Sequence, residues 1–342
     1  MATASARRPT ILDVAERAGV SKSLVSLVLR DSPRVSAERR QRVLEVVEEL
    51  GYELNTAARS LATRSNGTIG VLVSDLHNPW AFDVVDAARP VLEEAGHTVL
   101  FSAVTASAAS GGGVDLSILQ AFRDLRVAGL LVIGTVPDKA PFSRVVSGGA
   151  VVFAGGGPDY IDTADVVRSD DAHGISMVVD HLVGLGHERI AHLGGLGGSV
   201  GAARVSGYAD AMENHGLGRN IHVVDADFSQ ESGYVAAQRA LGATGRLRPT
   251  ALACINDLAA LGAMTAADER GLQVAITGYD NISLGAMPRL GLTTVDPDSS
   301  TIGVAGAKTL LQRIQDHDFG GGFVHQPIVP ELVIRKSSLL GL

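Results

Sequence analysis

Several polar and aromatic side chains stand directly after short apolar runs of the sequence, where the strands of an α/β fold would end. An aromatic ring can cover one face of a sugar or a base, while guanidinium, amide and carboxylate groups make directional hydrogen bonds. Side chains of these types are usual in pockets for small polar ligands. The residues that together predict such a pocket are Asp75, Trp80, Arg204, Phe228, Asn256 and Asp280.

Each of these residues also has a purely structural interpretation. Trp80 and Phe228 belong to residue types that pack in cores, and Asp257 beside Asn256 could simply cap the next helix. Their shared position at strand ends is what favours a ligand site, because in open α/β sheets ligands bind beyond the carboxyl ends of the strands.

Other chemistry that the residue types could support lacks the necessary spacing. The glycine-rich run at 194–198 completes neither a dinucleotide-binding nor a Walker motif, so we interpret it as a tight turn between a strand and a helix. His181, His187 and His192 form no metal-binding motif, and Cys254 lies in an apolar run that favours an inert core thiol. The sequence predicts no catalytic residues, no metal site and no cofactor.

Residues 66–342 alternate between short β-branched runs and amphipathic helical segments. A run at 68–73 is followed by a helical segment at 80–95 and another run at 97–104. Alternation of this kind predicts an α/β fold with parallel sheets and helices on both faces. A second series begins after about residue 165, which favours two similar lobes with a ligand cleft between them. The later runs are 130–134, 150–154, 189–195, 222–226, 251–255 and 274–280.

The first 51 residues have a different pattern, typical of three short helices. Thr10 and Asp13 form a capping-box-like start to a helix of about eight residues, and Gly19 can end it. Ser21 can cap a second helix after a very short turn, and Ser36 can cap a third. Two short helices at this spacing predict a helix-turn-helix unit. The expected inward residues are Val25, Val28 and Leu29 in the second helix and Val43, Leu44, Val47 and Leu50 in the third.

The second helix would carry one polar face opposite that core. Because each residue of a helix turns by about 100°, this face spans about 140°. Lysine and serine can bond to base edges or phosphates, and a leucine can contact a thymine methyl group. The alternative is an ordinary solvated helix face. The face consists of Lys22, Ser23, Ser26, Leu27 and Arg30.

Charge and composition agree with a DNA-contacting head on a larger domain. The net charge of the 342 residues is −8, but residues 1–65 carry +3 and the remainder −11. Hydrophobic residues make up 46% of the chain without any run long enough to span a membrane. A single cysteine and an N-terminal segment without an apolar stretch favour a reducing compartment, so we expect the cytoplasm.

The stretch from Thr10 to Arg64 resembles, almost continuously, the DNA-binding head of the lactose/galactose repressor (LacI/GalR) family. The resemblance implies that Lys22 and Ser23 read bases and that Ser21, Leu24 and Ser26 face phosphates or pack the helix. Leu27 departs from the arginine that is common in the family, which removes a potential bidentate guanine contact. The DNA-binding residues expected in the head are Thr10, Ser21, Lys22, Ser23, Leu24, Ser26, Leu27, Arg30 and Ser36.

Residues 55–65 resemble the hinge helix of that family. Asn55 can cap a short run, but an isolated helix of this length is marginal in water. The resemblance implies that Asn55, Arg59 and Leu61 contact the operator, with Leu61 wedged into the minor groove of the kinked DNA. The alternative is a flexible alanine-rich linker.

The segments NPWAF, RVSGY, IND and TGYDN, followed by LTTVDP, resemble the family's effector domain in the same order. The resemblance implies that the six strand-end residues named first contact a small effector, for which a sugar is expected. Two departures point away from a typical hexose. Ala154 to Gly157 stand where the family often has a charged effector contact, and Pro297 replaces a frequent polar residue.

The sequence therefore predicts a repressor that binds a pseudo-palindromic operator as a homodimer, or as a higher oligomer, and is switched by an effector. Alternatives are a nucleoside-responsive or effector-independent regulator, a solute-binding protein, and an enzyme on the same scaffold. The expected domains are a head at 1–54, a hinge at 55–65 and a two-lobed domain at 66–342. The first lobe would take about 66–165 and 297–320, and the second about 166–296 and 321–342.

Overall fold

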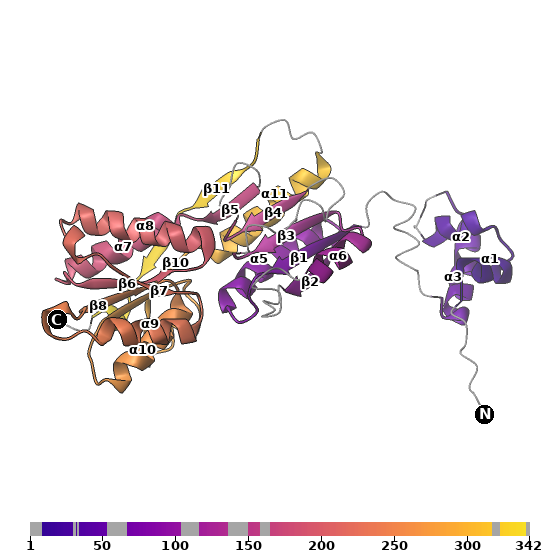
Figure 1. Cartoon of the computed structure of the whole chain (residues 1–342). Coiled ribbons are helices and arrows are strands. Elements are labelled where there is room, and N and C mark those ends of the chain that lie inside the picture. The colour runs from indigo at the N-terminus through magenta and orange to yellow at the C-terminus, as the bar shows by residue number, and fades with distance from the viewer. Residues whose placement is uncertain are drawn as a thin grey trace, which may run out of the picture. The chain divides into compact units, whose positions relative to one another are not determined.

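The computed structural model describes residues 9–29, 32, 34–52, 67–103, 116–135, 150–157, 165–316 and 322–339. The chain divides into two compact units, Met1–Asn66 and Gly67–Leu342 (Figure 1). The expected hinge at 55–65, with Asn55, Arg59 and Leu61, lies outside the described residues, as does Arg30. Within the described ranges, no helix is long and apolar enough to cross a membrane.

The smaller unit is a three-helix head whose helices are α1 (Ile11–Ala18), α2 (Lys22–Leu29) and α3 (Ala37–Leu50). Thr10 and Asp13 form the capping box that starts α1, with the Thr10 amide 2.6 Å from the Asp13 carboxylate. Gly19 ends α1 in the left-handed region at φ 67°, which lets the chain turn at once into α2. The short turn and the two helices confirm the predicted helix-turn-helix.

The buried face of α3 differs in detail from the expected one. Leu44 is 43% exposed, and Val46 is buried in its place beside Val43. Residues three and four apart share a helix face, whereas Leu44 stands about 100° from Val43 and so turns outward. Ser36 precedes α3 in an extended conformation, but its side chain makes no capping hydrogen bond.

The first lobe of the larger unit is a six-stranded parallel sheet in the order β11-β5-β4-β3-β1-β2. Side chains alternate along each strand, so odd and even positions enter separate cores on the two faces. The helices α5 and α11 pack on one face and α6 on the other. The elements are β1 (Thr68–Val73), α5 (Pro79–Glu94), β2 (Thr98–Ala103), α6 (Leu116–Asp124), β3 (Gly129–Ile133), β4 (Val151–Ala154), β5 (Asp165–Ser169), α11 (Ser299–Gln315) and β11 (His325–Ile328).

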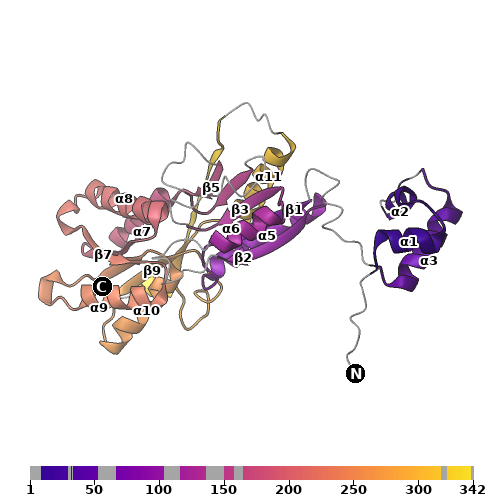
Figure 2. The same cartoon turned by 45° about the vertical axis from the view of Figure 1, so that its right-hand side comes forward.

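The second lobe has the strand order β12-β10-β9-β8-β6-β7, parallel except for β12. The helices α7 and α8 cover one face, and α9 and α10 cover the other (Figures 1 and 2). The elements are α7 (Asp171–Gly184), β6 (Ile190–Gly195), α8 (Gly198–Asn214), η4 (Gly218–Asn220), β7 (His222–Ala226), α9 (Gln230–Leu241), η5 (Gly245–Leu247), β8 (Ala251–Cys254), α10 (Asp257–Glu269), β9 (Ala275–Tyr279), β10 (Thr293–Asp296), β12 (Glu331–Val333) and η6 (Lys336–Ser338).

The doubly wound α/β fold with two lobes is thus confirmed, but the expected lobe limits need correction. Strand β5 continues to Ser169 in the first sheet, and β11 pairs with it in parallel, although residues 166–169 and 325–328 were expected in the second lobe. The reason that β11 was missed is its sequence, His-Gln-Pro-Ile, which lacks the apolar alternation of a strand, and its edge position tolerates the proline.

The chain crosses between the lobes three times, after β5, after β10 and after β11. Each crossing runs from the end of a strand in one sheet to an element of the other lobe. The carboxyl ends of the parallel strands of both sheets therefore face the same region, which is where ligands of such sheets bind.

Candidate effector pocket and DNA-binding head

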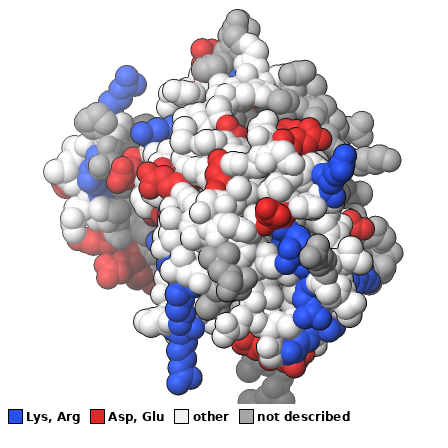
Figure 3. All heavy atoms as spheres, turned by 90° about the vertical axis from the view of Figure 1, so that its left-hand side faces the viewer, with Lys and Arg blue, Asp and Glu red and all other residues white. Residues whose placement is uncertain are grey.

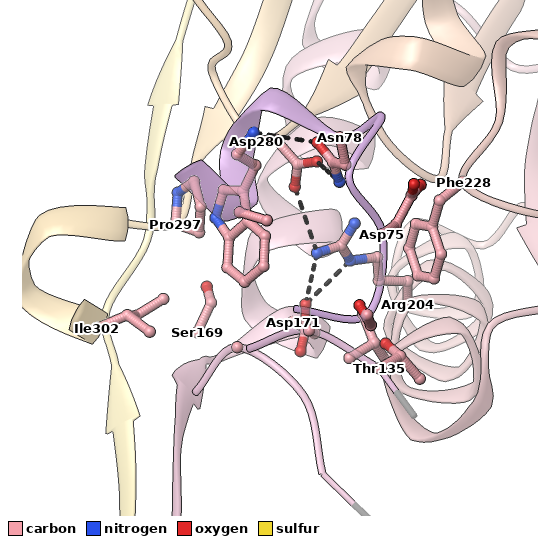
Figure 4. Close-up of a pocket in the computed structure, with 16 residues that line it drawn as sticks. Asp75, Asn78, Thr135, Ser169, Asp171, Arg204, Phe228, Asp280, Pro297 and Ile302 are labelled. Carbon is pink, nitrogen blue, oxygen red and sulfur yellow. Dashed lines mark hydrogen bonds and ion pairs between the residues drawn. The ribbon is translucent and has the colours of Figure 1, made fainter. Parts of the chain in front are cut away.

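A cavity of about 130 Å³ lies between the two lobes of the larger unit. An engineered protein cavity of roughly 150 Å³ binds benzene, so this volume suits a ligand of about one ring. Figure 4 shows side chains from both lobes directed toward it. The lining residues are Ser74, Asp75, Asn78, Trp80, Ala81, Gly134, Thr135, Gly155, Ser169, Asp171, Val200, Arg204, Phe228, Asp280, Pro297 and Ile302.

Arg204, in α8, is the buried cation of this cavity. Its Nε and one Nη donate to the same oxygen of Asp171, at 2.9 and 2.8 Å (Figure 4). The other Nη donates to the carbonyl of Ile255, and the guanidinium lies 3.5 Å from the centroid of the Tyr279 ring. Asp280 is further away, with 4.0 Å between its oxygen and the nearest Nη. These contacts all come from the second lobe, so Arg204 is held rigidly in place before any ligand arrives.

Asp280 follows β9 and is the buried acid that both lobes reach. It adopts φ 114°, a conformation that residues other than glycine rarely take. The side-chain amide of Asn78, from the first lobe, donates to its Oδ2 at 3.3 Å (Figure 4). Burial raises the pKa of Asp280 to about 7, against the opposite effect of Arg204. Asp280 can therefore exist in either protonation state near neutral pH.

The turn that carries Asp280 is held by hydrogen bonds to Asp257, the first residue of α10. The Asp257 carboxyl accepts from the hydroxyl of Thr294 at 2.5 Å and from the amide of Ile282 at 2.9 Å. Burial raises the pKa of Asp257, and the nearby Asp280 carboxyl raises it further. Asp257 is fully buried and does not line the cavity, so its role is to hold the turn.

Two aromatic rings form the apolar walls, and each rests on a glycine. A Cβ on Gly155 would lie 1.9 Å from the Trp80 ring, and one on Gly197 would lie 2.3 Å from the Phe228 ring. Both glycines also have positive φ, at 78° and 106°. The departure at Gly155 thus has a structural reason, because the indole of Trp80 occupies the space that a side chain there would need.

Five of the six predicted ligand contacts line the cavity, and Asn256 does not. Asn256 is fully buried, where its Oδ1 accepts from the amide of Ala259 at the start of α10 and its amide donates to the carbonyl of Phe228. It therefore orders the wall of the cavity without touching its interior. Asp75 lies at the rim, with its side chain 43% exposed and bonded to the amide and ring of His77.

The sequence interpretation missed five polar lining residues, Ser74, Asn78, Thr135, Ser169 and Asp171. Two of them start helices, since Asn78 caps α5 by accepting from the amide of Trp80 and Asp171 is the first residue of α7. The Asn-Pro and Asp-Asp pairs are helix-start signals that could have placed both near the same sheet edge. Ser74, Thr135 and Ser169 had no signal beyond their position after an apolar run.

The described residues were also compared with the requirements of a metal site. No group of three His, Cys, Asp or Glu side chains within the described ranges is arranged to hold a metal ion. Cys254 is fully buried in β8, and burial raises the pKa of its thiol, which opposes nucleophilic character.

The head presents the expected polar face on α2. Ser21, Lys22 and Ser23 are exposed, and the Ser21 hydroxyl also accepts from the amide of Leu24 at 3.2 Å. Ser26 is half-buried, while Leu24 and Leu27 pack partly against the core of the head. The side chains with most freedom to reach a base edge are therefore Lys22 and Ser23. Thr10 is occupied by its capping box and Ser36 is exposed.

Comparison with known proteins identifies both units. Residues 10–55 match the family described as bacterial regulatory proteins of the lacI family, and residues 179–338 match a periplasmic binding protein-like domain. The transcriptional repressor PurR of Photobacterium profundum is 30% identical over 340 residues, which cover 96% of this chain and 98% of that protein. The ribose operon repressor of Haemophilus influenzae is 31% identical, with the same coverage.

A solved structure agrees with these relatives over the whole length. The lac repressor dimer bound to operator and the anti-inducer ONPF superposes with a TM-score of 0.82 at 28% identity, covering 97% of this chain and 99% of that one. A matching head, a matching two-lobed domain and relatives that align almost end to end lead to one conclusion: this chain belongs to the LacI family of bacterial regulatory proteins.

Proposed function

We propose that this protein is a cytoplasmic transcriptional repressor that binds its operator as a homodimer and responds to a small polar ring compound in the cavity between its lobes. The observation that carries the proposal is the cavity itself, which combines two aromatic walls with Arg204 and Asp280. As a LacI-family protein the chain is a DNA-binding transcription regulator, and its relatives PurR and the ribose operon repressor are named as repressors.

The polar lining suits a ligand that is both flat and hydroxyl- or amide-bearing. Trp80 and Phe228 offer ring faces, and the carboxyl of Asp280 and the remaining N–H groups of Arg204 offer an acceptor and donors. Sugars and nucleosides both have such groups, and a monosaccharide, with its single ring, is closer to the volume of the cavity than a nucleoside is. Gly155 and Pro297 contribute no polar side chain, so the ligand's polar groups would find their partners elsewhere in the lining, at Asp75 and Asn78 of the first lobe and at Arg204 and Asp280 of the second.

The switch would work through the contacts that join the lobes. Asn78 bonds to Asp280 across the cavity, and the hydroxyl of Ser199 donates to the carbonyl of Gly157 at 2.9 Å. A ligand that contacts both lobes favours the arrangement in which these bonds are made. The favoured arrangement then changes how well two heads fit two half-sites of the operator.

The test measures operator binding and Trp80 fluorescence together in the full-length protein. DNA selected by the protein from a random pool is titrated with neutral sugars and nucleosides, and Trp80 is the sole tryptophan. We expect one compound to change both signals. In Phe228→Ala the response should be lost while DNA binding remains, because that ring lines the cavity.

The matched control is Phe323→Ala, which removes a 49% exposed phenyl group that does not line the cavity and should leave the response unchanged. A Phe228→Ala protein that responds at the same ligand concentration as the wild type would overturn the assignment of the cavity as the effector site.

A further inference from the structure

We propose that the effector is a ring compound without a negative charge, so that the protein senses the free form of a metabolite and rejects its phosphate and carboxylate forms. This inference rests on the proposed function, because it concerns the ligand of the same cavity. It follows from how the charges around the cavity are already paired.

The cation of the cavity is largely committed to the protein. Arginine has five N–H donors. Two of those of Arg204 go to Asp171 and a third goes to the Ile255 carbonyl, while the Tyr279 ring covers one face of the guanidinium. The remaining N–H groups can donate to a hydroxyl, a carbonyl or a ring nitrogen. The positive charge of the guanidinium, however, is already balanced by the buried carboxylate of Asp171, 2.8 Å away.

Carboxylates outnumber cations among the groups around the cavity. Asp75, Asp171 and Asp280 line it, whereas Arg204 is the one Lys or Arg among the described lining residues. Arg168 adds a second cation, 3.3 Å from Asp171, but it does not line the cavity. An anionic ligand would therefore meet the carboxyl groups of Asp75 and Asp280 and would be repelled by each of them in its ionised form, and like charges brought together in an interface are strongly unfavourable.

Helix N-termini are the other common source of anion binding, and those at the cavity are already occupied. Side chains cap α5 through Asn78, α7 through Asp170 and α11 through Asp298, each by accepting a backbone N–H at 3.0 to 3.1 Å. Helix α8 begins at Gly198 and its N-cap, Gly197, has no side chain, but the apolar ring of Phe228 lies against Gly197. To bind at one of these helix N-termini, a phosphate group would thus have to displace the Phe228 ring or compete with the side chain that caps the helix.

The volume of the cavity agrees with this assignment. About 130 Å³ suits one ring between the two aromatic walls, and leaves little space for a hydrated phosphate beside it. The acceptor oxygens of Asp75 and Asp280 match the hydroxyl and amino donors of a neutral sugar, a nucleoside or an amino sugar.

The test compares pairs of compounds in which one member carries an additional phosphate group or a carboxylate, by Trp80 fluorescence and operator binding of the full-length protein. Glucuronate is the member closest in size to its neutral counterpart. The pairs are ribose and ribose 5-phosphate, glucose and glucose 6-phosphate, glucose and glucuronate, and adenosine and adenosine monophosphate, with glucosamine as a cationic member. We expect any binder to be a neutral or cationic member, and its anionic counterpart to bind roughly 100-fold more weakly or not at all.

Two neighbouring aspartates give a matched pair of variants. Asp171→Asn removes the carboxylate that balances the charge of Arg204. It should therefore reduce the preference for the neutral member by about tenfold. Asp170→Asn removes an equal charge from the adjacent exposed residue, keeps a capping side chain, and should leave the preference unchanged. Should Asp171→Asn fold poorly, Asp280→Asn removes the other buried carboxyl and should shift the preference in the same direction.

If an anionic member bound more tightly than its neutral counterpart and this binding were lost in Phe228→Ala, the proposal of an effector without negative charge would be overturned. The assignment of the cavity as the effector site would still hold. Binding of neither class, with DNA binding retained, would instead overturn the proposed function and this inference with it.

Discussion

At the scale of single residues, Asp280 has an unusual backbone conformation, lies near a buried cation and joins the two lobes. Its positive φ aims the carboxyl into the cavity, Arg204 lies 4.0 Å from it, and Asn78 binds it from the other lobe. A residue held in an unfavourable conformation persists only where its surroundings fix it, and here the Asp257 contacts do so.

The raised pKa of Asp280 predicts a specific dependence of stability on pH. The folded protein keeps this proton up to about pH 7, whereas the unfolded chain loses it near the ordinary value of 3.8. Between these two values the folded state binds more protons, so its stability falls as the pH rises. Thermal unfolding without ligand should therefore show a Tm that falls more steeply between about pH 4 and pH 7 in the wild type than in Asp280→Asn. Parallel curves for the two proteins would contradict the assignment.

The contact between Gly155 and Trp80 predicts the effect of a single methyl group. Gly155→Ala places a Cβ where the indole lies and adds strain of about 1 to 2 kcal/mol from the positive φ. Trp80 must then move, so effector affinity should fall by about tenfold or more, with DNA binding retained.

Gly184→Ala is the control for that substitution, because Gly184 ends α7 with open space around it and no positive φ. Alanine in a helix is favoured over glycine by up to about 1 kcal/mol, so this variant should keep or gain stability. Equal losses of effector binding in both variants, measured by Trp80 fluorescence, would argue against the proposed role of Gly155.

The residue types and their order along the chain predicted most of the pocket. Trp80, Arg204 and Phe228 could be found because they follow recognisable strands. Asp171 could not, because its importance lies in its pairing with Arg204, 33 residues away, and such a pair is visible only once two helices pack together. Asn256, which was predicted as an effector contact, lies behind the cavity wall, where its hydrogen bonds go to the amide of Ala259 and the carbonyl of Phe228.

At the scale of elements, strands with a distinct apolar run were predicted, including the edge strands β2 and β7, whereas β5, β10, β11 and β12 were not. Continuous apolar runs such as Thr68–Val73 and Gly129–Ile133 are buried along their whole length. Strands β11 and β12 are short and partly exposed, so their sequences carry little periodic signal. The lobe limits were displaced because β5 and β11 were not recognised, although the two-lobed α/β pattern was.

The exposed polar face of α2, the second helix of the helix-turn-helix, leads to a prediction for DNA binding. Lys22 is exposed at its first turn and Leu27 is partly packed into the core, so Lys22 should dominate base contacts. Lys22→Ala should reduce the discrimination between selected operator and scrambled DNA by about 1 to 3 kcal/mol, measured at fixed salt. Lys308→Ala, which removes an exposed lysine of α11 in the other unit, should change neither affinity. An equal loss of affinity on both DNAs in Lys22→Ala would point to a phosphate contact instead.

At the scale of the whole molecule, the two units divide the charge as well as the function. Residues 1–65 carry +3 and the rest −11. On the face of the larger unit that Figure 3 presents, Lys and Arg side chains are interspersed with Asp and Glu among mostly uncharged residues. Attraction to the phosphate backbone is therefore expected to come from the heads, and to weaken as salt increases.

The division at Asn66 predicts that the larger unit is autonomous. A fragment of residues 67–342 contains both sheets and the complete cavity, so it should fold cooperatively and bind the effector with the affinity of the full chain. It should not bind operator. Calorimetric unfolding and ligand titration of the fragment check this, and an unfolded or non-binding fragment would show that the units depend on each other.

The three crossings between the lobes also determine the order in which the protein becomes functional during its synthesis. A chain is made from its N-terminus, so the head is available to fold first. The first lobe, in contrast, needs α11 and β11, which reach only to Ile328, before its sheet and one of its cores are complete. A ribosome that stalls before this point would release a chain that carries the DNA-binding head but lacks a finished sensor.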